Sequence, residues 1–168
     1  MTKAIWSKII LDEAGKELPA LFYGCVADLL EHDMVARLDN FSQHVGTSRL
    51  QHSINVAYYS FLICRRLGLD YRSAARAGIM HDLFLYDWRE VHSSKKHVRS
   101  HPKAALENAR KVTALNKVEE DAIRRHMWPL TIRPPKYLEG HVVSFADKIC
   151  ACAEVAERCR EIYLAGQN

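Results

Sequence analysis

Histidine and aspartate are the residues of this sequence whose number and placement could support chemistry. The chain has nine histidines among 168 residues, and histidine is both the commonest metal ligand and a proton-transfer group near neutral pH. His81-Asp82 lies inside an apolar segment, where an imidazole and a carboxylate are costly to bury unless they are paired or bound to a metal. The second such dipeptide, His32-Asp33, lies at the polar end of an expected helix and is interpreted as a chance occurrence.

Four more residues could join this dipeptide, because each lies on or at the end of a different expected helix: His52, His101, His126 and Asp147. Successive candidates are about one helix and one connection apart, so consecutive packed helices could bring them together. Imidazole and carboxylate ligands without cysteine suit divalent iron, manganese or zinc better than calcium. Together with His81 and Asp82, these ligands are enough for two ions.

The elements that would position these residues are helical. Apolar residues recur at intervals of three and four, and glycine and proline are scarce, so the sequence predicts an all-α fold, a compact bundle of helices. We expect helices over about 18–33, through 35–41, from Thr47 or Ser48 to Gly68, from Asp70 to Asp82, from His101 through 112, from Asn116 to His126 and over about 138–163.

Two connecting segments and one helix face carry further expectations. The polar, basic segment 86–100 is expected to be a loop or lid, with Pro102 in the first turn of the helix that follows. The proline-containing segment 128–137 is expected to be irregular. On the last helix we expect a core stripe, with Asp147 off it, made of Val142, Phe145, Ile149, Cys152 and Ala156.

Length and composition indicate one ordinary globular domain over residues 1–168, with its core at about 43–160 and the helices of 18–41 packed on that core. The longest uncharged apolar stretch, 18–27, is shorter than the roughly 20 residues that span a bilayer, and the N-terminal apolar run is too short for a signal peptide. Five cysteines without a CxxC spacing do not indicate a disulfide framework. We therefore expect a cytoplasmic protein with no membrane or nucleic-acid partner, and the sequence leaves its oligomeric state open.

From about Gln43 to Glu154 the sequence resembles the HD superfamily of metal-dependent phosphohydrolases, most clearly in the segments 47–57, 78–83, 101–105 and 145–149. The resemblance implies a helical HD-type domain. It also implies that a first ion is held by His52, His81, Asp82 and Asp147, that Asp82 bridges, and that His101 and His126 hold a second ion as in the binuclear branch. The Gly-Tyr-Pro signature of the cyclic-dinucleotide phosphodiesterases is absent.

This resemblance implies a phosphohydrolase in which two divalent ions activate water for attack on phosphorus, with Asp82 and His81 as catalytic residues. Iron or manganese is the expected metal, with zinc, nickel, cobalt or magnesium as further options. The expected substrate is a small phosphomonoester, phosphodiester or phosphoanhydride, with nucleotides as the favoured class. Candidate substrate contacts, chosen by position, are Arg49, Lys148, Lys95, Lys96 and His44.

Two alternatives stay open at this point. A single metal ion at His52, His81, Asp82 and Asp147 would be typical of a nucleoside-monophosphate phosphatase. A non-catalytic regulatory module could keep the same ligands to bind a metal or a nucleotide without turnover.

Overall fold

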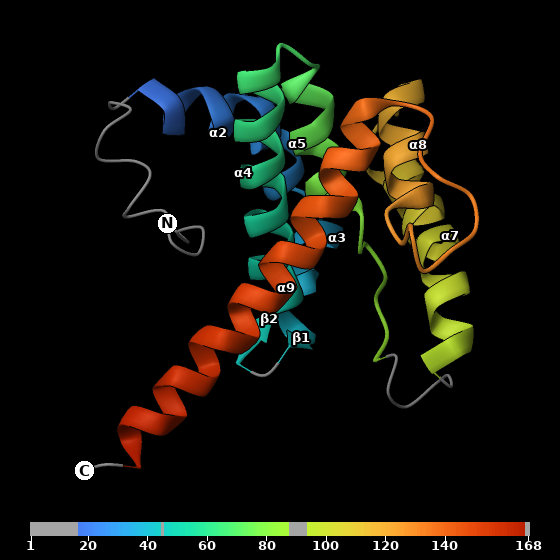
Figure 1. The fold of residues 1–168 in the computed structure, drawn as a ribbon. Helices are drawn as coiled ribbons and strands as arrows, with labels where there is room; N and C mark the ends of the chain where they lie inside the picture. The colour runs from blue at the N-terminus through green and yellow to red at the C-terminus, as the bar shows by residue number, and fades with distance from the viewer. Residues whose placement is uncertain (1–16, 45, 88–93, 167–168) are drawn as a thin grey trace.

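The computed structural model of the chain describes residues 17–44, 46–87 and 94–166, and within these it describes only the backbone at 17–19, 44 and 94–98. Helices make up almost all of the regular structure, which confirms the all-α prediction (Figure 1). The elements are α2 (Glu17–Leu30), α3 (Asp33–Ala36), the 3-10 helix η1 (Arg37–Asn40), β1 (Ser42–His44), β2 (Thr47–Ser48), α4 (Arg49–Leu67), α5 (Tyr71–Met80), α7 (Ser94–Val112), α8 (Lys117–Arg125) and α9 (Leu138–Ala165).

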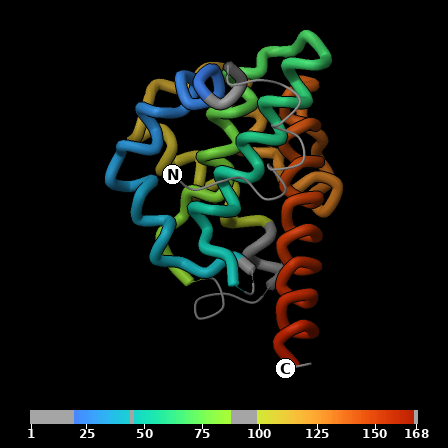
Figure 2. The backbone as a smooth tube through the Cα atoms, turned by 90° about the vertical axis from the view of Figure 1, so that its left-hand side faces the viewer, coloured from blue at the N-terminus to red at the C-terminus, as the bar shows by residue number. Residues whose placement is uncertain are grey.

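The antiparallel pair α4 and α5 forms the centre of the bundle. Helix α2 packs on α5 at one side, while α7 and α8 pack on each other at the opposite side (Figure 1). Helix α9 crosses α4, α5 and α8, and its C-terminal half extends beyond the other helices (Figures 1 and 2). Candidate ligands on α4, α7 and α9 and at the ends of α5 and α8 therefore converge on the middle of the bundle.

Local capping signals in the sequence explain most helix boundaries. The Asp70 side chain accepts a hydrogen bond from the backbone of Ser73 at the start of α5. Asn116 and Glu119 form a reciprocal capping box at the start of α8. Gly68 ends α4 with a φ of 70°, a left-handed conformation that favours glycine. These boundaries agree with the sequence prediction.

Helix α7 begins earlier than predicted. Residues 94–100 are helical instead of forming a loop, so Pro102 lies inside α7 and not in its first turn. The sequence signal of a proline at a helix start was misleading, because buried Ala105, Leu106 and Ala109 hold the following turns against the bundle and packing can outweigh the local cost of proline. Trp88 and the rest of 88–93 lie outside the described residues.

A short hairpin was also missed. Strands β1 and β2 pair around Gly46, whose φ of 85° is again left-handed. Strands this short contain too few residues for the alternation of polar and apolar side chains to be recognised in the sequence.

The predicted core stripe of α9 was wrong except at Val142, which packs half-buried against the core. Phe145 and Ile149 are 58% and 43% exposed, and Cys152 and Ala156 are also exposed. The buried residues of this helix are Gly140, Val143, Ser144, Ala146, Cys150, Ala153 and Glu154. The periodicity identified a continuous apolar face, but the helix packs on the bundle through its opposite face. That face was not recognised from the sequence because it also carries polar groups, which belong to the site described below.

No helix in the described part of the chain is long and apolar enough to cross a membrane.

Helices α4 and α5 approach each other closely at Gly78. A Cβ atom at this position would lie 2.5 Å from Cα of Ala57, a distance that only a backbone shift could relieve. Glycine at position 78 thus permits the close spacing of α4, which carries His52, and α5, which His81 follows.

We predict that Gly78→Ala lowers the free energy of unfolding by about 2 kcal/mol or more, because overpacking a rigid contact typically costs about 1–3 kcal/mol. Gly24→Ala is the matched control, since Gly24 lies in α2 and a Cβ added there would have no neighbouring atom within 4 Å, and it should be neutral or stabilising by up to about 1 kcal/mol. Urea unfolding in the presence of a chelator measures both. Equal stabilities of the two variants would contradict this account of the helix contact.

Candidate metal centre

His52 is held in the bundle interior by α4 and α9. Ser48 caps α4 by accepting a hydrogen bond from the backbone N–H of Gln51, which places His52 at the end of the first turn. The imidazole is fully buried. Its Nδ1 atom lies 3.0 and 3.1 Å from the two carboxylate oxygens of Glu154, and its Nε2 atom lies 3.2 Å from Oδ1 of Asp147. One nitrogen is thus oriented by a carboxylate while the other points into the centre.

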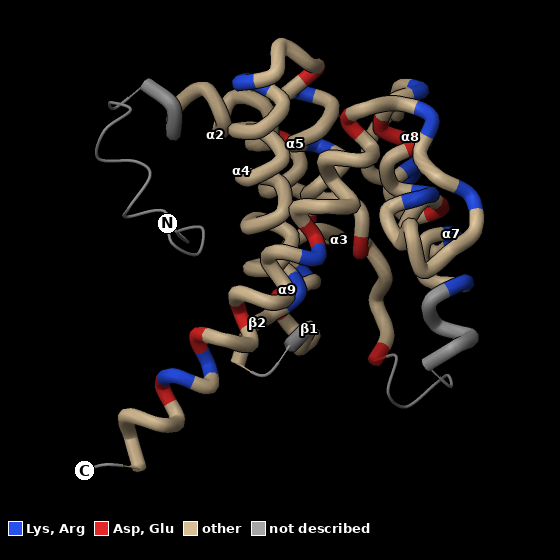
Figure 3. The backbone as a smooth tube through the Cα atoms, in the orientation of Figure 1, with Lys and Arg blue, Asp and Glu red and all other residues tan. Residues whose placement is uncertain are grey.

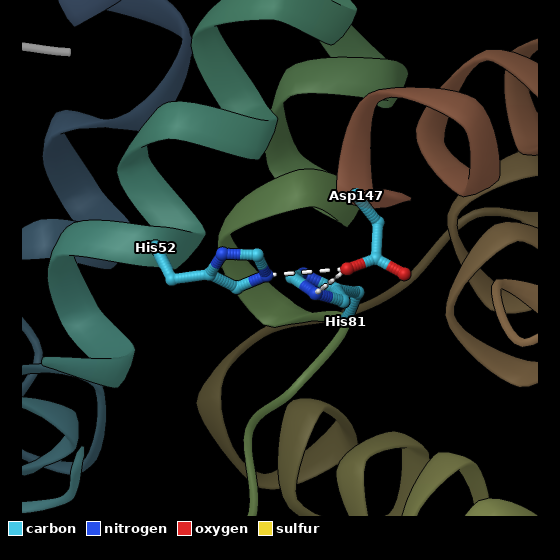
Figure 4. A group of neighbouring side chains, drawn as sticks. All are labelled: His52, His81 and Asp147. Carbon is cyan, nitrogen blue, oxygen red and sulfur yellow. Dashed lines mark hydrogen bonds and ion pairs between the residues drawn. The ribbon is translucent and has the colours of Figure 1, made fainter. Parts of the chain in front are cut away.

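His81 follows α5 directly and is also fully buried. Its Nδ1 atom donates a hydrogen bond of 2.8 Å to the backbone carbonyl of Gly78. The Nε2 atom then faces Asp147, at 3.7 Å from Oδ1 (Figure 4). The ligand atoms of His52, His81 and Asp147 lie within 4.8 Å of one another, which makes this triad a candidate metal site.

Asp82 belongs to a second triad. Its Oδ1 atom lies 3.3 Å from Nε2 of His101 and 3.5 Å from Nε2 of His126. The two imidazole Nε2 atoms are 2.9 Å apart, and Nδ1 of His126 donates to the carbonyl of Ile123. These three ligand atoms also lie within 4.8 Å of one another.

The resemblance placed Asp82 with His52, His81 and Asp147 and also made it a bridge between the two ions. In the structure the closest ligand atoms to Asp82 are those of His101 and His126. The other carboxylate oxygen of Asp82, Oδ2, lies 3.7 Å from Nε2 of His81. Asp82 thus lies between the two triads.

Two buried atoms at the centre are not satisfied by the protein. Nε2 of His81 and Oδ1 of Asp82 make no hydrogen bond to any described residue. A buried polar atom without a partner is costly, and a cation between imidazole nitrogens and carboxylate oxygens would satisfy both atoms. The donor set of imidazole and carboxylate fits a divalent transition metal.

The neighbouring histidines keep Asp82 and Asp147 ionised. Burial alone raises the pKa of Asp82, but the neighbouring His81 and His101 outweigh burial and hold it well below its usual value. Burial alone likewise raises the pKa of Asp147, but the neighbouring His52 and His81 outweigh burial and hold it well below its usual value. Both side chains are therefore negatively charged at neutral pH, as metal ligands must be.

The histidines are shifted in opposite directions. Burial alone lowers the pKa of His52, but hydrogen bonds to Asp147 and Glu154 outweigh burial and raise it to about 10. Burial dominates at His126, where it lowers the pKa. The His126 imidazole is consequently neutral at pH 7, the form that binds a cation.

Arg49, expected to contact substrate, has its guanidinium in the interior. The group lies 3.7 Å above the Phe84 ring and donates hydrogen bonds to the Phe84 carbonyl and to Oε1 of Gln43. Gln43 in turn donates through Nε2 to Oδ2 of Asp82 at 2.5 Å. The structure therefore links Arg49 to the metal centre through Gln43.

The remaining candidate substrate contacts are placed less completely. Lys148 is partly exposed; its ammonium donates to the backbone carbonyls of His126 and Ser144 and lies 3.5 Å from Oδ2 of Asp147. Lys95 and Lys96 occupy the first turn of α7, and His44 ends β1, but the side chains of these three residues lie outside the described part.

Glu154 is the site residue that sequence reasoning missed. Its side chain is fully buried; it accepts hydrogen bonds from Asn55 at 2.7 Å and from His52. A usable signal existed, because Glu154 follows Asp147 by seven residues, which is two turns along the same face of α9.

Comparison with known proteins agrees with this geometry. Residues 49–152 match the HD domain family. The chain is also 31% identical over 153 residues to ribonuclease Y of Thermus thermophilus, in an alignment that covers 90% of this chain and 24% of that protein. The chain thus spans about a quarter of the length of this relative. No solved structure gives a significant match.

HD domain proteins are in general metal-dependent hydrolases, and the matched region contains all six candidate ligands. With a helical bundle whose centre gathers those imidazoles and carboxylates, and with a match over residues 49–152, this chain belongs to the HD domain family.

Proposed function

We propose that this chain is a phosphohydrolase that uses two divalent transition-metal ions, iron or manganese, to hydrolyse a small phosphorylated compound, with nucleotides as the substrate class. The observation that supports it most is the pair of adjacent triads, each able to offer three ligand atoms. His52, His81 and Asp147 would hold one ion, and Asp82, His101 and His126 the other. A pair of divalent ions supplies an activated water and offsets charge on the phosphoryl oxygens.

Within this proposal Asp82 and His81 have the central roles. Asp82 presents one oxygen to His101 and His126 and the other toward His81, so a single carboxylate can serve both ions. Gln43 orients that carboxylate through its hydrogen bond to Oδ2. Lys148 remains the proposed phosphate contact, because its ammonium is partly exposed beside Asp147 and can complement anionic oxygens.

Similarity to a ribonuclease supports a second candidate substrate, a phosphodiester bond in RNA. A panel of nucleoside monophosphates, dinucleotides, dinucleoside polyphosphates and short RNA, assayed with manganese and with iron under anaerobic conditions, distinguishes the substrate classes. Absence of turnover across this panel would favour the non-catalytic module.

The first prediction concerns Asp82. Because Asp82 contacts both triads, we expect Asp82→Asn to lower kcat/KM by at least about 100-fold. Loss of a residue that only orients a metal ligand typically costs about 10–100-fold, and loss of the ligand itself should cost more. Asp33→Asn is the matched control, since Asp33 belongs to the other His-Asp dipeptide and is exposed. Activity in the Asp82 variant equal to that of the control would show that the hydrolytic site lies elsewhere.

The second prediction concerns metal content. We expect metal analysis of anaerobically purified, fully loaded protein to give two ions per chain, and His101→Ala to reduce this to one. At a free metal concentration of about 100 Kd, binding stabilises the folded state by about 2.7 kcal/mol, so chelation should lower Tm by roughly 5–10 °C. One ion per chain in the loaded wild type would instead support the mononuclear alternative.

The third prediction concerns Glu154. A carboxylate that accepts the N–H of a ligating histidine fixes the ring and increases its basicity, and its loss typically costs about 10–100-fold in metal affinity. We therefore expect Glu154→Gln to weaken binding at the triad of His52 by about that factor in a calorimetric manganese titration. Glu157→Gln, at an exposed position of the same helix, should bind as the wild type does.

If Glu154→Gln changed thermal stability but left the manganese affinity unaltered, Glu154 would be a packing residue and not a positioning residue for His52.

A further inference from the structure

Helix α9 exposes a row of apolar side chains, while its inward face combines small apolar residues with two carboxylates. Between residues 138 and 154, where the helix packs on the bundle, the exposed positions are Leu138, Phe145, Ile149 and Cys152. The inward face of the same segment carries Asp147 and Glu154. The solvent face of a helix is normally the polar one, so this arrangement leaves an apolar face without a partner in the described part of the chain.

The exposed face continues with a regular spacing. From Leu138 the apolar residues recur at alternating intervals of four and three, through Val142 and Ala156, to Cys159 and Tyr163. Val142 lies at the edge of this row, half-buried against the core of its own bundle. This is the spacing of the a and d positions of a coiled coil, which pack against a second helix. We call this row of residues, from Leu138 to Tyr163, the α9 seam.

We infer that the α9 seam pairs with the α9 seam of a second copy of this chain, in antiparallel orientation. In one register, every residue of the α9 seam lies opposite another seam residue of the second copy. It sets Leu138 opposite Tyr163, Val142 opposite Cys159, Phe145 opposite Ala156 and Ile149 opposite Cys152. The same four contacts recur on the other side of a twofold axis, as a closed homodimer requires.

Size and charge are complementary in this register. The largest side chain near the middle, Phe145, faces the smallest, Ala156, which is the interdigitation that coiled-coil packing favours. Beside the seam, Glu139 in the first turn of one helix falls opposite Arg160 of the other; one oxygen of Glu139 accepts a hydrogen bond from the backbone N–H of Asp70, so the pairing uses the other oxygen. Arg160 lies in the exposed C-terminal half of α9, where both signs of charge follow one another (Figure 3). Two symmetric ion pairs of this kind select the antiparallel orientation.

The exposed area is sufficient for such a contact. Phe145 and Tyr163 are 58% and 67% exposed, and Leu138 is 64% exposed. Since an aromatic side chain buries about 150–250 Å², the seam exposes several hundred Å², the size of the largest apolar patch on a typical monomer, which is often an interaction site. The flanking Val155 and Ile162, also exposed, extend it toward the roughly 800 Å² per partner of a standard interface.

The position of α9 leaves this face accessible. The C-terminal half of the helix extends beyond the other helices (Figures 1 and 2), and the seam lies on the side of α9 away from the metal ligand Asp147. A second copy can therefore approach this face without displacing any helix or strand of the described residues. The pairing does not depend on the proposed hydrolase activity.

Sedimentation equilibrium of the whole chain tests the pairing. We expect the wild type to be a dimer at micromolar concentration and Phe145→Glu to raise the dimer Kd by at least about 30-fold, as expected for a central interface residue. Glu157→Lys, an exposed charge change off the seam, should leave the Kd unchanged. A monomeric wild type, or a dimer insensitive to Phe145→Glu, would overturn the inference. Far-UV circular dichroism checks that the variant is folded.

Disulfide cross-linking tests the register without disrupting the seam. In a Cys152→Ser background, Cys159 is the remaining exposed cysteine of the described residues. In the antiparallel register the two Cys159 side chains are 17 residues apart along the helices, about 26 Å, so no cross-link should form. Adding Val142→Cys should produce a covalent dimer under mild oxidation. A covalent dimer of the Cys152→Ser protein, linked through Cys159 alone, would indicate a parallel pair. If neither this protein nor the one with the added Val142→Cys formed a covalent dimer, the proposed register would also be overturned.

Discussion

Burial of imidazole and carboxylate groups in an apolar interior is the constraint on which the rest of this structure depends. Ionisable groups are tolerated there when opposite charges, hydrogen bonds or cations compensate for the lost water. Here Asp82 and Asp147 each lie beside histidines, and the unsatisfied atoms that remain, on His81 and Asp82, belong one to each triad. Helices α4, α5, α7, α8 and α9 each contribute a member of this set from within the helix or directly after it, and the spacing of α4 and α5 is limited by the contact of Gly78 with Ala57.

Local chemistry in the sequence was enough to predict most of the helices, because capping residues such as Asp70 and Asn116 act on the turn that follows them. The start of α7 was not predictable in this way, since it is packing of residues beyond Pro102 that stabilises the helix. The six candidate ligands could be selected from residue type and order. How they divide into two triads could not, because a spacing along the chain does not determine which oxygen of Asp82 faces which imidazole.

Arg49 and α9 illustrate a different limit. The sequence placed a cation near a ligand histidine but did not predict that the Arg49 side chain turns inward onto Phe84 and Gln43; its contact with substrate stays a prediction. An apolar row on a helix indicates a packing surface. The sequence pattern is the same whether that surface packs on the helix's own bundle or on another molecule. The inward face of α9 was not predicted as a packed face because Asp147 and Glu154 interrupt its apolar residues, although such polar residues are what this centre is built from.

The histidines of the centre also differ in how far along the chain their orienting partners lie. His81 and His126 are each oriented by a carbonyl three residues earlier, so their rings are set once their own helices form. His52 depends on Asp147 and Glu154, 95 and 102 residues later. During synthesis, which proceeds from the N-terminus, α4 and α5 leave the ribosome long before α9. Until α9 docks, His52 faces a gap in the bundle with neither of its carboxylates, and the centre is completed by the last of the described helices to be made.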